Sequence, residues 1–191
     1  PFIAGKSAYF MSLNRGKRSL SLNLTRPEAQ EAIHRLIPSI DVVVSNYRPA
    51  VPARLTIDYE TLSAIKPDLI YLDSTAFGRR GPWANKGGYD IVVQGASGLT
   101  ASGGRFDENG TPILPGSVAT ADYATGYSIA WGVCAALFYR ERTGKGQLVE
   151  TSLLANALQF QGGSVMSLPP ADTLLRQPLL DYLDDAHLRG A

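Results

Sequence analysis

The chain has 191 residues, of which 45% are hydrophobic and 18% are charged, and its formal net charge is +1. This length can bury a core in one domain or slightly more. The near-neutral charge gives no electrostatic signature of a nucleic acid or an anionic membrane as partner. With one cysteine and two separated histidines, the composition excludes an internal disulfide and predicts no metal site. No run reaches the roughly 20 apolar residues of a membrane span.

The two ends of the chain predict that it is a fragment of a longer protein. It begins at Pro1 without a methionine and stops abruptly at Ala191. The first residues resemble neither a signal peptide nor the start of a domain. We expect a cytoplasmic location, with a mitochondrial one left open because the true N-terminus would precede Pro1.

The first half of the chain predicts alternating strands and helices. Residues 19–24 alternate polar and apolar side chains, as a strand does. Thr25 and the glutamate three residues later have capping-box spacing and predict the start of a helix. The apolar run at residues 41–45 predicts a strand covered on both faces, residues 54–66 are predicted to be mostly helical, and residues 69–72 form a third predicted strand.

The second half continues the alternation around one long helix. A loop rich in glycine and basic residues covers residues 78–88, and a helix is predicted over residues 89–97. Residues 98–116 predict a loop with a candidate hairpin. After the long helix, residues 147–151 predict a fourth strand and residues 153–161 a further helix.

This order of elements predicts an α/β fold with an open, mostly parallel sheet and flanking helices, because strands and helices alternate with short connections. We expect residues 1–168 to form the compact part of the chain, as a partial large domain. Residues 169–191, which begin with two prolines, would be a linker or the start of a smaller domain.

Asp122 lies at the mouth of the long helix, which has no formal charge from Tyr127 to Tyr139 and which Gly144 is placed to end. Its carboxylate is predicted to cap the first turn, where the helix dipole favours an anion. A carboxylate held ionised at the end of a buried helix can act as a nucleophile. Most such aspartates only cap, so position alone leaves both roles open. Cys134, inside this apolar helix, is predicted to be a buried structural thiol.

Ligands of open α/β sheets bind beyond the carboxyl ends of the strands, which here indicates residues 23–25, 46–48 and 76–78. Arg48 and the nearby Arg54 suit phosphate oxygens, which would indicate a phosphorylated cofactor. An ordinary solvated loop explains these two arginines equally well.

Glycines offer a second candidate for ligand contact. Gly87 and Gly88 allow close backbone approach to a ligand, although a flexible turn would need the same residues. No glycine pattern of a dinucleotide or triphosphate site follows a predicted strand. No serine or cysteine lies in a nucleophile-elbow sequence, so a hydrolase triad has no support.

Four segments, in this order, resemble the family III CoA-transferases: residues 14–20 (NRGKRSL), 41–49 (DVVVSNYRP), 88–90 (GYD) and 140–147 (RERTGKGQ). The resemblance extends from about Tyr9 to about Gln161. That family includes formyl-CoA transferase, carnitine-type CoA-transferases and α-methylacyl-CoA racemase. It implies a Rossmann-like large domain for CoA binding and catalysis, and an interlocked homodimer in the full-length protein.

The resemblance also implies roles for individual residues. The catalytic aspartate of the transferases corresponds to Asp122, which would attack an acyl-CoA thioester to give an aspartyl anhydride and free CoA thiolate. An acceptor carboxylate would then replace the donor acid, and CoA would leave on the new acyl group. No cofactor would be bound permanently, because coenzyme A or acyl-CoA is a substrate. The CoA contacts that carry over are Leu22, Asn23, Leu24, Thr25, Asn46, Tyr47, Arg48, Arg54, Gly87, Gly88, Tyr89 and Asp90.

Tyr89 favours the transferase branch of this family over the racemase branch. The racemases pair the aspartate with a histidine, whose motif position is Tyr89 here. Tyrosine, with a reference pKa of about 10, is a poor partner for proton abstraction near neutrality. CoA transfer is therefore the leading hypothesis, an acyl-CoA racemase or epimerase the second, and a non-catalytic acyl-CoA-binding fragment the third. The family's N-terminal strand and its glycine-rich loop would lie outside this chain, so the donor and acceptor acids are undetermined.

Overall fold

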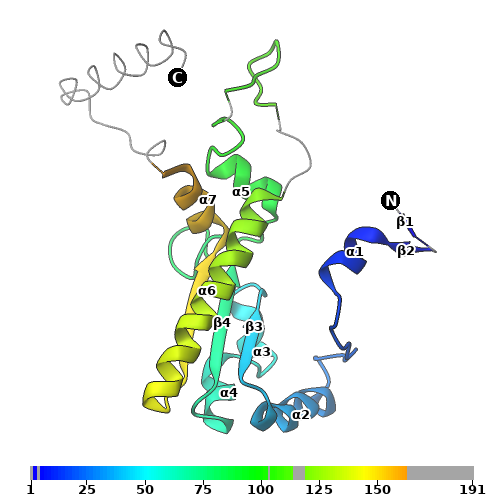
Figure 1. The fold of residues 1–191 in the computed structure, drawn as a ribbon, viewed down its shortest axis with the longest axis vertical. Coiled ribbons are helices and arrows are strands. Elements are labelled where there is room, and N and C mark those ends of the chain that lie inside the picture. Colours follow the sequence, from blue (N-terminus) through cyan, green and yellow to red (C-terminus); the bar gives the residue numbers. More distant parts are fainter. Residues whose placement is uncertain (1, 4, 103, 114–118, 163–191) are drawn as a thin grey trace, which may run out of the picture.

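Figure 1 presents the computed structural model of the chain, which describes residues 2–3, 5–102, 104–113 and 119–162. The segment predicted to be a linker or a second domain, residues 169–191, lies outside the described residues. The elements are β1 (Phe2–Ile3), β2 (Lys6–Ser7), α1 (Ala8–Leu13), α2 (Pro27–Leu36), the 3-10 helix η1 (Ile37–Ser39), β3 (Val42–Ser45), α3 (Ala50–Arg54), α4 (Tyr59–Ile65), β4 (Ile70–Thr75), α5 (Asp90–Ala96), α6 (Thr120–Thr143), β5 (Gln147–Ser152) and α7 (Leu153–Gln161).

Three parallel strands in the order β3-β4-β5 form the main sheet. In the middle strand, Ile70 lies opposite Val42 on one side and Gln147 on the other. All six residues of β4 are buried, as expected of a strand with two partners and two covered faces. The predicted α/β fold with a parallel sheet and flanking helices is confirmed.

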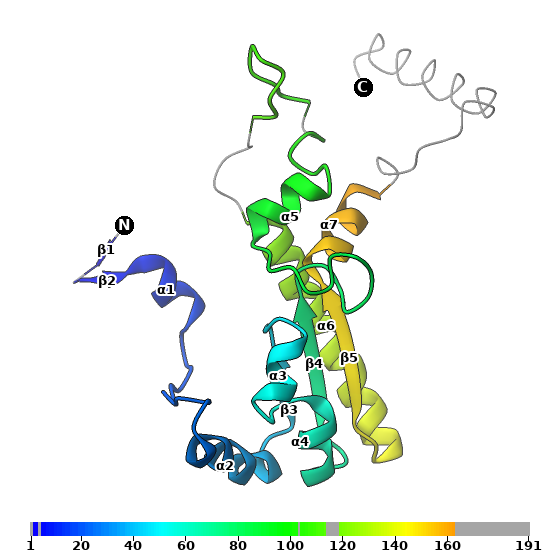
Figure 2. The same ribbon diagram turned by 180° about the vertical axis from the view of Figure 1, so that it is seen from behind.

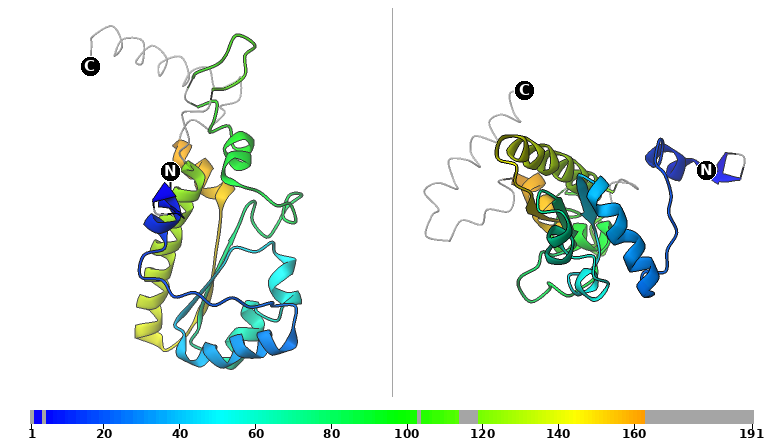
Figure 3. Two further views of the ribbon diagram at one scale, coloured as in Figure 1. Left: turned by 90° about the vertical axis from the view of Figure 1, so that its right-hand side faces the viewer. Right: turned by 90° about the horizontal axis from the view of Figure 1, so that it is seen from below.

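Helices cover the two faces of this sheet, as Figures 1 and 2 show from opposite sides. On one face, α2, η1 and α4 close over a core built from Ile37, Leu62, Leu69 and Tyr71. On the other face, α6 lies along β4 and β5 (Figure 3). The helix approaches the sheet closely at Gly132, where an added Cβ would lie 3.1 Å from Cγ1 of Val149.

Glycines form the turn from α6 into β5, as the sequence predicts. Gly144 ends the helix in the left-handed region with φ of 70°. Gly146 permits the turn to touch the preceding strand, because an added Cβ would lie 2.1 Å from the carbonyl oxygen of Leu69. Arg140 also fixes this end of the helix, since its Nη2 lies 2.9 Å from Oδ1 of Asp41.

The strand predicted at residues 19–24 is wrong, because this segment has irregular backbone and pairs with no strand of the described chain. Alternation predicts which side chains share a face, but a strand also needs a partner. The predicted cap is wrong as well. Helix α2 begins after Arg26 without a side-chain cap, and the backbone N–H of Thr25 instead donates to Oδ1 of Asn23 at 3.1 Å.

One further prediction is met in part near β3, and another is wrong. Residues 54–66, predicted to be mostly helical, contain the last residue of α3 and the whole of α4, and the gap between them arises because Thr56 adopts a positive φ of 55° and Asp58 caps α4. Strand β3 was predicted to be covered on both faces, but Val44 is 54% exposed. Strand β3 lies at the edge of the described sheet, and α6 packs along β4 and β5.

The outer face of α6 is apolar and exposed. Tyr127, Trp131 and Phe138 are 77%, 80% and 62% exposed, and their spacing places them on one side of the helix. Cys134 shares this side and is exposed, so its predicted burial is wrong. None of the described helices combines the length and the hydropathy that a membrane crossing requires.

Two short segments lie outside the sheet layers. The N-terminal elements β1, β2 and α1 stand apart from the sheet and are joined to α2 by an extended stretch (Figures 1 and 3). The hairpin predicted within residues 98–116 is present as one antiparallel bridge between Phe106 and Pro112. Residues 103 and 114–118 of that loop lie outside the described residues.

Candidate active site

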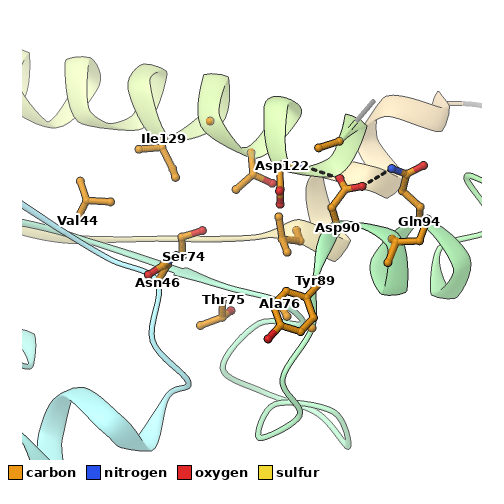
Figure 4. A pocket seen from close by; sticks show the side chains of 16 residues that line it. Val44, Asn46, Ser74, Thr75, Ala76, Tyr89, Asp90, Gln94, Asp122 and Ile129 are labelled. Carbon is orange, nitrogen blue, oxygen red and sulfur yellow. Dashed lines mark hydrogen bonds between the residues drawn. The ribbon is translucent and has the colours of Figure 1, made fainter. Parts of the chain in front are cut away.

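A cavity of about 880 Å³ opens at the carboxyl ends of β3 and β4, beside the first turns of α5 and α6 (Figure 4). It is lined by Val44, Asn46, Ser74, Thr75, Ala76, Gly88, Tyr89, Asp90, Ile91, Gln94, Ala119, Asp122, Thr125, Gly126, Ile129 and Leu153. The formally charged side chains of this lining are Asp90 and Asp122, and we therefore refer to it as the carboxylate cavity. Its place at the strand ends agrees with the ligand side of an open α/β sheet.

Asp122 lies in the first turn of α6 and lines the carboxylate cavity, but it does not cap the helix as predicted. The N-cap position belongs to Ala119, and no side chain caps from that position. The cap comes instead from another helix, because the backbone N–H of Asp122 donates to Oδ1 of Asp90 at 2.9 Å. No group of the described chain donates a hydrogen bond to the Asp122 carboxylate. Capping alone therefore does not explain this residue.

Asp90 ties the starts of two helices together at the cavity wall. It is the first residue of α5, and its Oδ2 accepts a hydrogen bond from Nε2 of Gln94, one turn further along that helix. Its Oδ1 accepts from the backbone of Asp122, so one carboxylate is shared between α5 and α6 (Figure 4). The sequence grouped Asp90 with the CoA contacts, whereas its observed partners are Gln94 and Asp122.

The environment of Asp122 disfavours its ionised form. Burial raises the pKa of its carboxyl above the usual range, and the negative charge of Asp90 raises the pKa further. The sequence predicted instead that the helix dipole would hold this carboxylate ionised. Partial desolvation and the neighbouring carboxylate thus act against the dipole at this position. On acidification, Asp122 therefore loses its charge at a higher pH than an ordinary aspartate.

A second, smaller cavity of about 250 Å³ adjoins the first. It is lined by Asn46, Tyr47, Arg48, Pro49, Thr75, Ala76, Lys86, Gly87, Gly88 and Tyr89. The formally charged side chains here are Arg48 and Lys86, and we refer to this cavity as the cationic recess. The two cavities share Asn46, Thr75, Ala76, Gly88 and Tyr89, so they form one continuous depression with opposite charge at its two ends.

Packing within the protein requires a glycine at position 88, whereas Gly87 faces the movable end of the Arg48 side chain. A Cβ at Gly87 would lie 2.6 Å from Nη2 of Arg48, and a Cβ at Gly88 would lie 2.7 Å from Cβ of Ala76. The sequence predicts that a ligand approaches the backbone of these glycines. In the structure, the neighbours at this distance are Arg48 and Ala76 of the protein itself. A merely flexible turn therefore does not describe Gly88.

Five predicted CoA contacts do not line either of these cavities: Leu22, Asn23, Leu24, Thr25 and Arg54. The first four lie in the irregular segment before α2, and Arg54 is the last residue of α3. They stay predictions. The strand ends after β3 and β4 do converge, since Asn46 and Ala76 line both cavities.

Several lining residues were missed by sequence reasoning. Ser74 and Thr75 were overlooked because the predicted strand stopped two residues before Ser74, whereas β4 continues to Thr75. Lys86 was noted only as part of a basic loop. It lies over the ring of Trp83, with Nζ 4.9 Å from the ring centroid, and this contact depends on the folded loop.

Tyr9 was not predicted to belong to the site, but it lies within electrostatic reach of it. The neighbouring phenol of Tyr123 raises the pKa of Tyr9 above its usual value. The carboxylates of Asp122 and Asp90 contribute to the same shift. No local sequence signal links Tyr9 to residues so far along the chain.

Comparison with known proteins identifies similar chains. The model of CoA-transferase family III matches residues 1–177. Acetyl-CoA:oxalate CoA-transferase of Acetobacter aceti is 38% identical over 167 residues, which cover 87% of this chain and 42% of the relative. Succinate–glutarate CoA-transferase of Agrobacterium fabrum is 40% identical, covering 78% of this chain and 36% of the relative. The human succinyl-CoA:glutarate CoA-transferase is 36% identical, covering 82% of this chain and 35% of the relative.

Solved structures support the same grouping. A CAIB/BAIF family protein from Brucella suis superposes with a TM-score of 0.76 at 36% identity, covering 84% of this chain and 42% of that one. A protein from Mycobacterium tuberculosis superposes with a TM-score of 0.75 at 33% identity, covering 80% of this chain and 41% of that one. The chain thus spans less than half the length of the relatives and structures it matches.

Proposed function

This chain belongs to CoA-transferase family III, and we propose that the complete gene product moves coenzyme A between an acyl-CoA and a carboxylic acid. The observation that carries the proposal is the division of charge in one continuous depression. Two carboxylates line the larger cavity and two cations line the adjoining recess. The named relatives act on acyl-CoA and carboxylate pairs such as acetyl-CoA with oxalate and succinyl-CoA with glutarate.

The cationic recess suits the phosphate groups of coenzyme A. Arg48 presents a planar guanidinium that can donate two parallel hydrogen bonds to phosphate oxygens, and Lys86 adds a point charge. The carboxylate cavity adjoins the recess through shared wall residues, so a thioester carried on the same ligand would reach Asp122. In this proposal the cationic recess binds the phosphate groups of coenzyme A, and the thioester reacts in the carboxylate cavity.

The proposed reaction begins at the carboxylate of Asp122. Its oxygen attacks the thioester carbonyl carbon, the C–S bond breaks, and an aspartyl anhydride and CoA thiolate form. The acceptor carboxylate then attacks the aspartyl carbonyl, and the donor acid leaves. Finally the thiolate attacks the new acyl carbonyl, which gives the product acyl-CoA and regenerates the Asp122 carboxylate.

Asp90 would support this chemistry without reacting. Its hydrogen bond to the backbone of Asp122 fixes the first turn of α6, and its charge raises the pKa of the Asp122 carboxyl. A carboxylate with a raised pKa is more basic once it is ionised, and the proposed attack uses this ionised form. Asp90 is thus proposed as a residue that positions and tunes the nucleophile.

The lining of both cavities favours transfer over racemisation. No histidine is among the residues that line them, and the position of the racemase histidine is occupied by Tyr89. His34, which lies in α2, is 2.7 Å from the carbonyl oxygen of Thr56 and so has another partner. The two-base exchange of an α-proton therefore lacks its second base among the described lining residues.

Oxygen-18 labelling of the acceptor acid tests the proposal directly. The complete gene product is incubated with succinyl-CoA and doubly ¹⁸O-labelled glutarate, and in parallel with acetyl-CoA and labelled oxalate. After a single turnover, the mechanism predicts a new acyl-CoA and one ¹⁸O atom in the peptide that contains Asp122, both measured by mass spectrometry. A new acyl-CoA without label in Asp122 would exclude the anhydride route.

A second incubation separates the alternative functions. With 2-methylacyl-CoA in deuterated water, the transferase predicts no deuterium at the α-carbon. Deuterium wash-in without acyl exchange would instead establish an isomerase of the same fold. Calorimetric binding of CoA without either reaction, across a panel of acids, would establish a non-catalytic binding protein.

A further inference from the structure

Arg79 joins the loop between β4 and α5 to two neighbouring strands of the sheet. Its Nε donates a hydrogen bond to Oδ2 of Asp73 and lies 3.4 Å from Oε1 of Glu150. Asp73 and Glu150 are register partners on β4 and β5. A single side chain from the loop thus bridges two strands at the end where the ligand cavities lie.

In the ion pair between Arg79 and Asp73, the aspartate is the buried partner. The Asp73 side chain is 1% exposed and the Arg79 side chain 30% exposed. A buried carboxylate is costly unless a cation compensates it, and Arg79 supplies that cation. The next residue, Arg80, is exposed and makes no ion pair within the described ranges. The two arginines therefore differ in role although they are adjacent in sequence.

The loop between β4 and α5 comprises residues 76–89. Its beginning is hydrogen-bonded to the sheet and to α7. The backbone N–H of Gly78 donates to Oγ1 of Thr75 at 3.0 Å, and the backbone N–H of Leu154 donates to the carbonyl oxygen of Ala76 at 3.0 Å. Arg79 extends the same attachment by one side chain. The first part of the loop is therefore held from three directions.

The end of the loop packs on its beginning and forms the walls of both cavities. A Cβ at Gly88 would lie 2.7 Å from Cβ of Ala76 and 3.0 Å from the ring of Phe77. Gly87 packs against the guanidinium of Arg48 in the cationic recess. A displacement of the attached part would thus be transmitted to the phosphate-binding end of the depression.

We propose that Arg79 is a positioning residue for acyl-CoA binding, which it supports by holding loop 76–89 against the sheet. This role rests on the proposed function. Arg79 touches neither cavity in which substrate would bind, so it acts through Gly87, Gly88 and Arg48. The nucleophile lies on α6 and not on the loop, so loss of the attachment weakens binding more than it slows the chemical step.

The test uses the complete gene product and a double variant, Asp73→Asn with Arg79→Met. This pair removes both charges, so that no buried charge is left unpaired and the fold is retained. We expect the KM for acyl-CoA to rise about tenfold while kcat stays within about twofold of the wild type. Arg79→Lys, which keeps the cation, recovers most of the affinity, and Arg80→Gln is the matched control that leaves KM unchanged.

Thermal unfolding and amide hydrogen exchange accompany the kinetics. Faster exchange confined to loop 76–89, at an unchanged Tm, supports the positioning role. A double variant with faster loop exchange and a wild-type KM overturns it, as does a variant in which kcat and KM worsen together with a lowered Tm. A wild type that binds CoA but transfers none overturns the proposed function, while its calorimetric CoA affinity still reports the effect of Arg79.

Discussion

The two adjoining cavities obtain their charge from different kinds of structure. In the carboxylate cavity, Asp90 and Asp122 come from the first turns of α5 and α6, and one hydrogen bond, from the backbone N–H of Asp122 to the Asp90 carboxylate, fixes one against the other. In the cationic recess, Arg48 and Lys86 come from loops and lie against Gly87 and an aromatic ring. Helix starts hold the groups that must be placed accurately, and loop side chains hold those that need only the right charge.

This difference also has an electrostatic consequence. Two carboxylates in one cavity oppose each other, and after desolvation the charge of Asp90 is the second cause that raises the pKa of Asp122. An anionic acceptor would meet the same repulsion on entering. In the proposed mechanism, acylation neutralises Asp122 before the acceptor attacks, so the acceptor meets one negative charge fewer. The recess has no such conflict, because its cations face the anionic part of the proposed ligand.

Removing the proposed nucleophile should distinguish the roles of the two cavities by the largest effect on activity. Asp122→Ala should abolish transfer, with a loss in kcat of at least about three orders of magnitude, because a covalent nucleophile is removed. CoA affinity should stay nearly unchanged, since the recess keeps both cations. Turnover assays and calorimetry on the same preparation check this expectation, with Asp122→Asn as the closest variant in shape. A turnover near the wild-type rate would remove Asp122 from the mechanism.

Removing a cation should have the converse effect. Arg48→Ala and Lys86→Ala should each weaken CoA binding by about ten- to a hundredfold, because each loses a charge-assisted contact with phosphate. Binding should also become less sensitive to salt, while kcat at saturation changes little. Calorimetry at two ionic strengths measures both effects.

Arg54 is the matched comparison for these variants. The sequence groups it with Arg48, but it does not line the recess. Arg54→Ala should therefore have a smaller effect on CoA affinity than Arg48→Ala. Equal losses in both would mean that the phosphate site extends to the end of α3.

The features predicted correctly from sequence depend on local chemistry. Gly144 ends α6 because its positive φ suits glycine, and helix α7 has the predicted limits of residues 153–161. The parallel sheet follows from apolar runs separated by helices. Each of these signals is contained within a few neighbouring residues, so one sequence suffices to find them.

The features that were missed depend on distant neighbours. Exposure of Val44 and Cys134 depends on where α6 lies, which an evenly apolar helix does not specify. The cap on α6 comes from Asp90 on a different helix, so inspection of α6 alone assigned it to Asp122. The sequence named Asp90 and Asp122 separately, but the hydrogen bond between them required the fold.

Asp90→Asn tests how the two carboxylates interact. Part of the rise in the Asp122 pKa comes from the Asp90 charge, so removing that charge should lower the pKa of Asp122. The nucleophile must be ionised, so the acidic limb of kcat/KM should move to lower pH. The amide oxygen of asparagine can still accept the Asp122 backbone N–H, whereas Asp90→Ala would lose that bond as well. An acidic limb that stays in place would show that Asp90 does not tune the nucleophile.

Tyr89 lies between the two cavities and should show the smallest effect. Its side chain lines both, it is 80% exposed, and it makes no side-chain capping bond at the start of α5. Tyr89→Phe keeps the ring and removes only the phenol, so transfer should fall by no more than about threefold, less than the worth of one ordinary hydrogen bond to a charged group. Kinetics of acyl exchange measure this change, and α-proton exchange in deuterated water should be absent in both proteins. If the phenol were instead a base, Tyr89→Phe would impair the enzyme about as much as Asp122→Ala, and the wild type would exchange the α-proton without moving CoA.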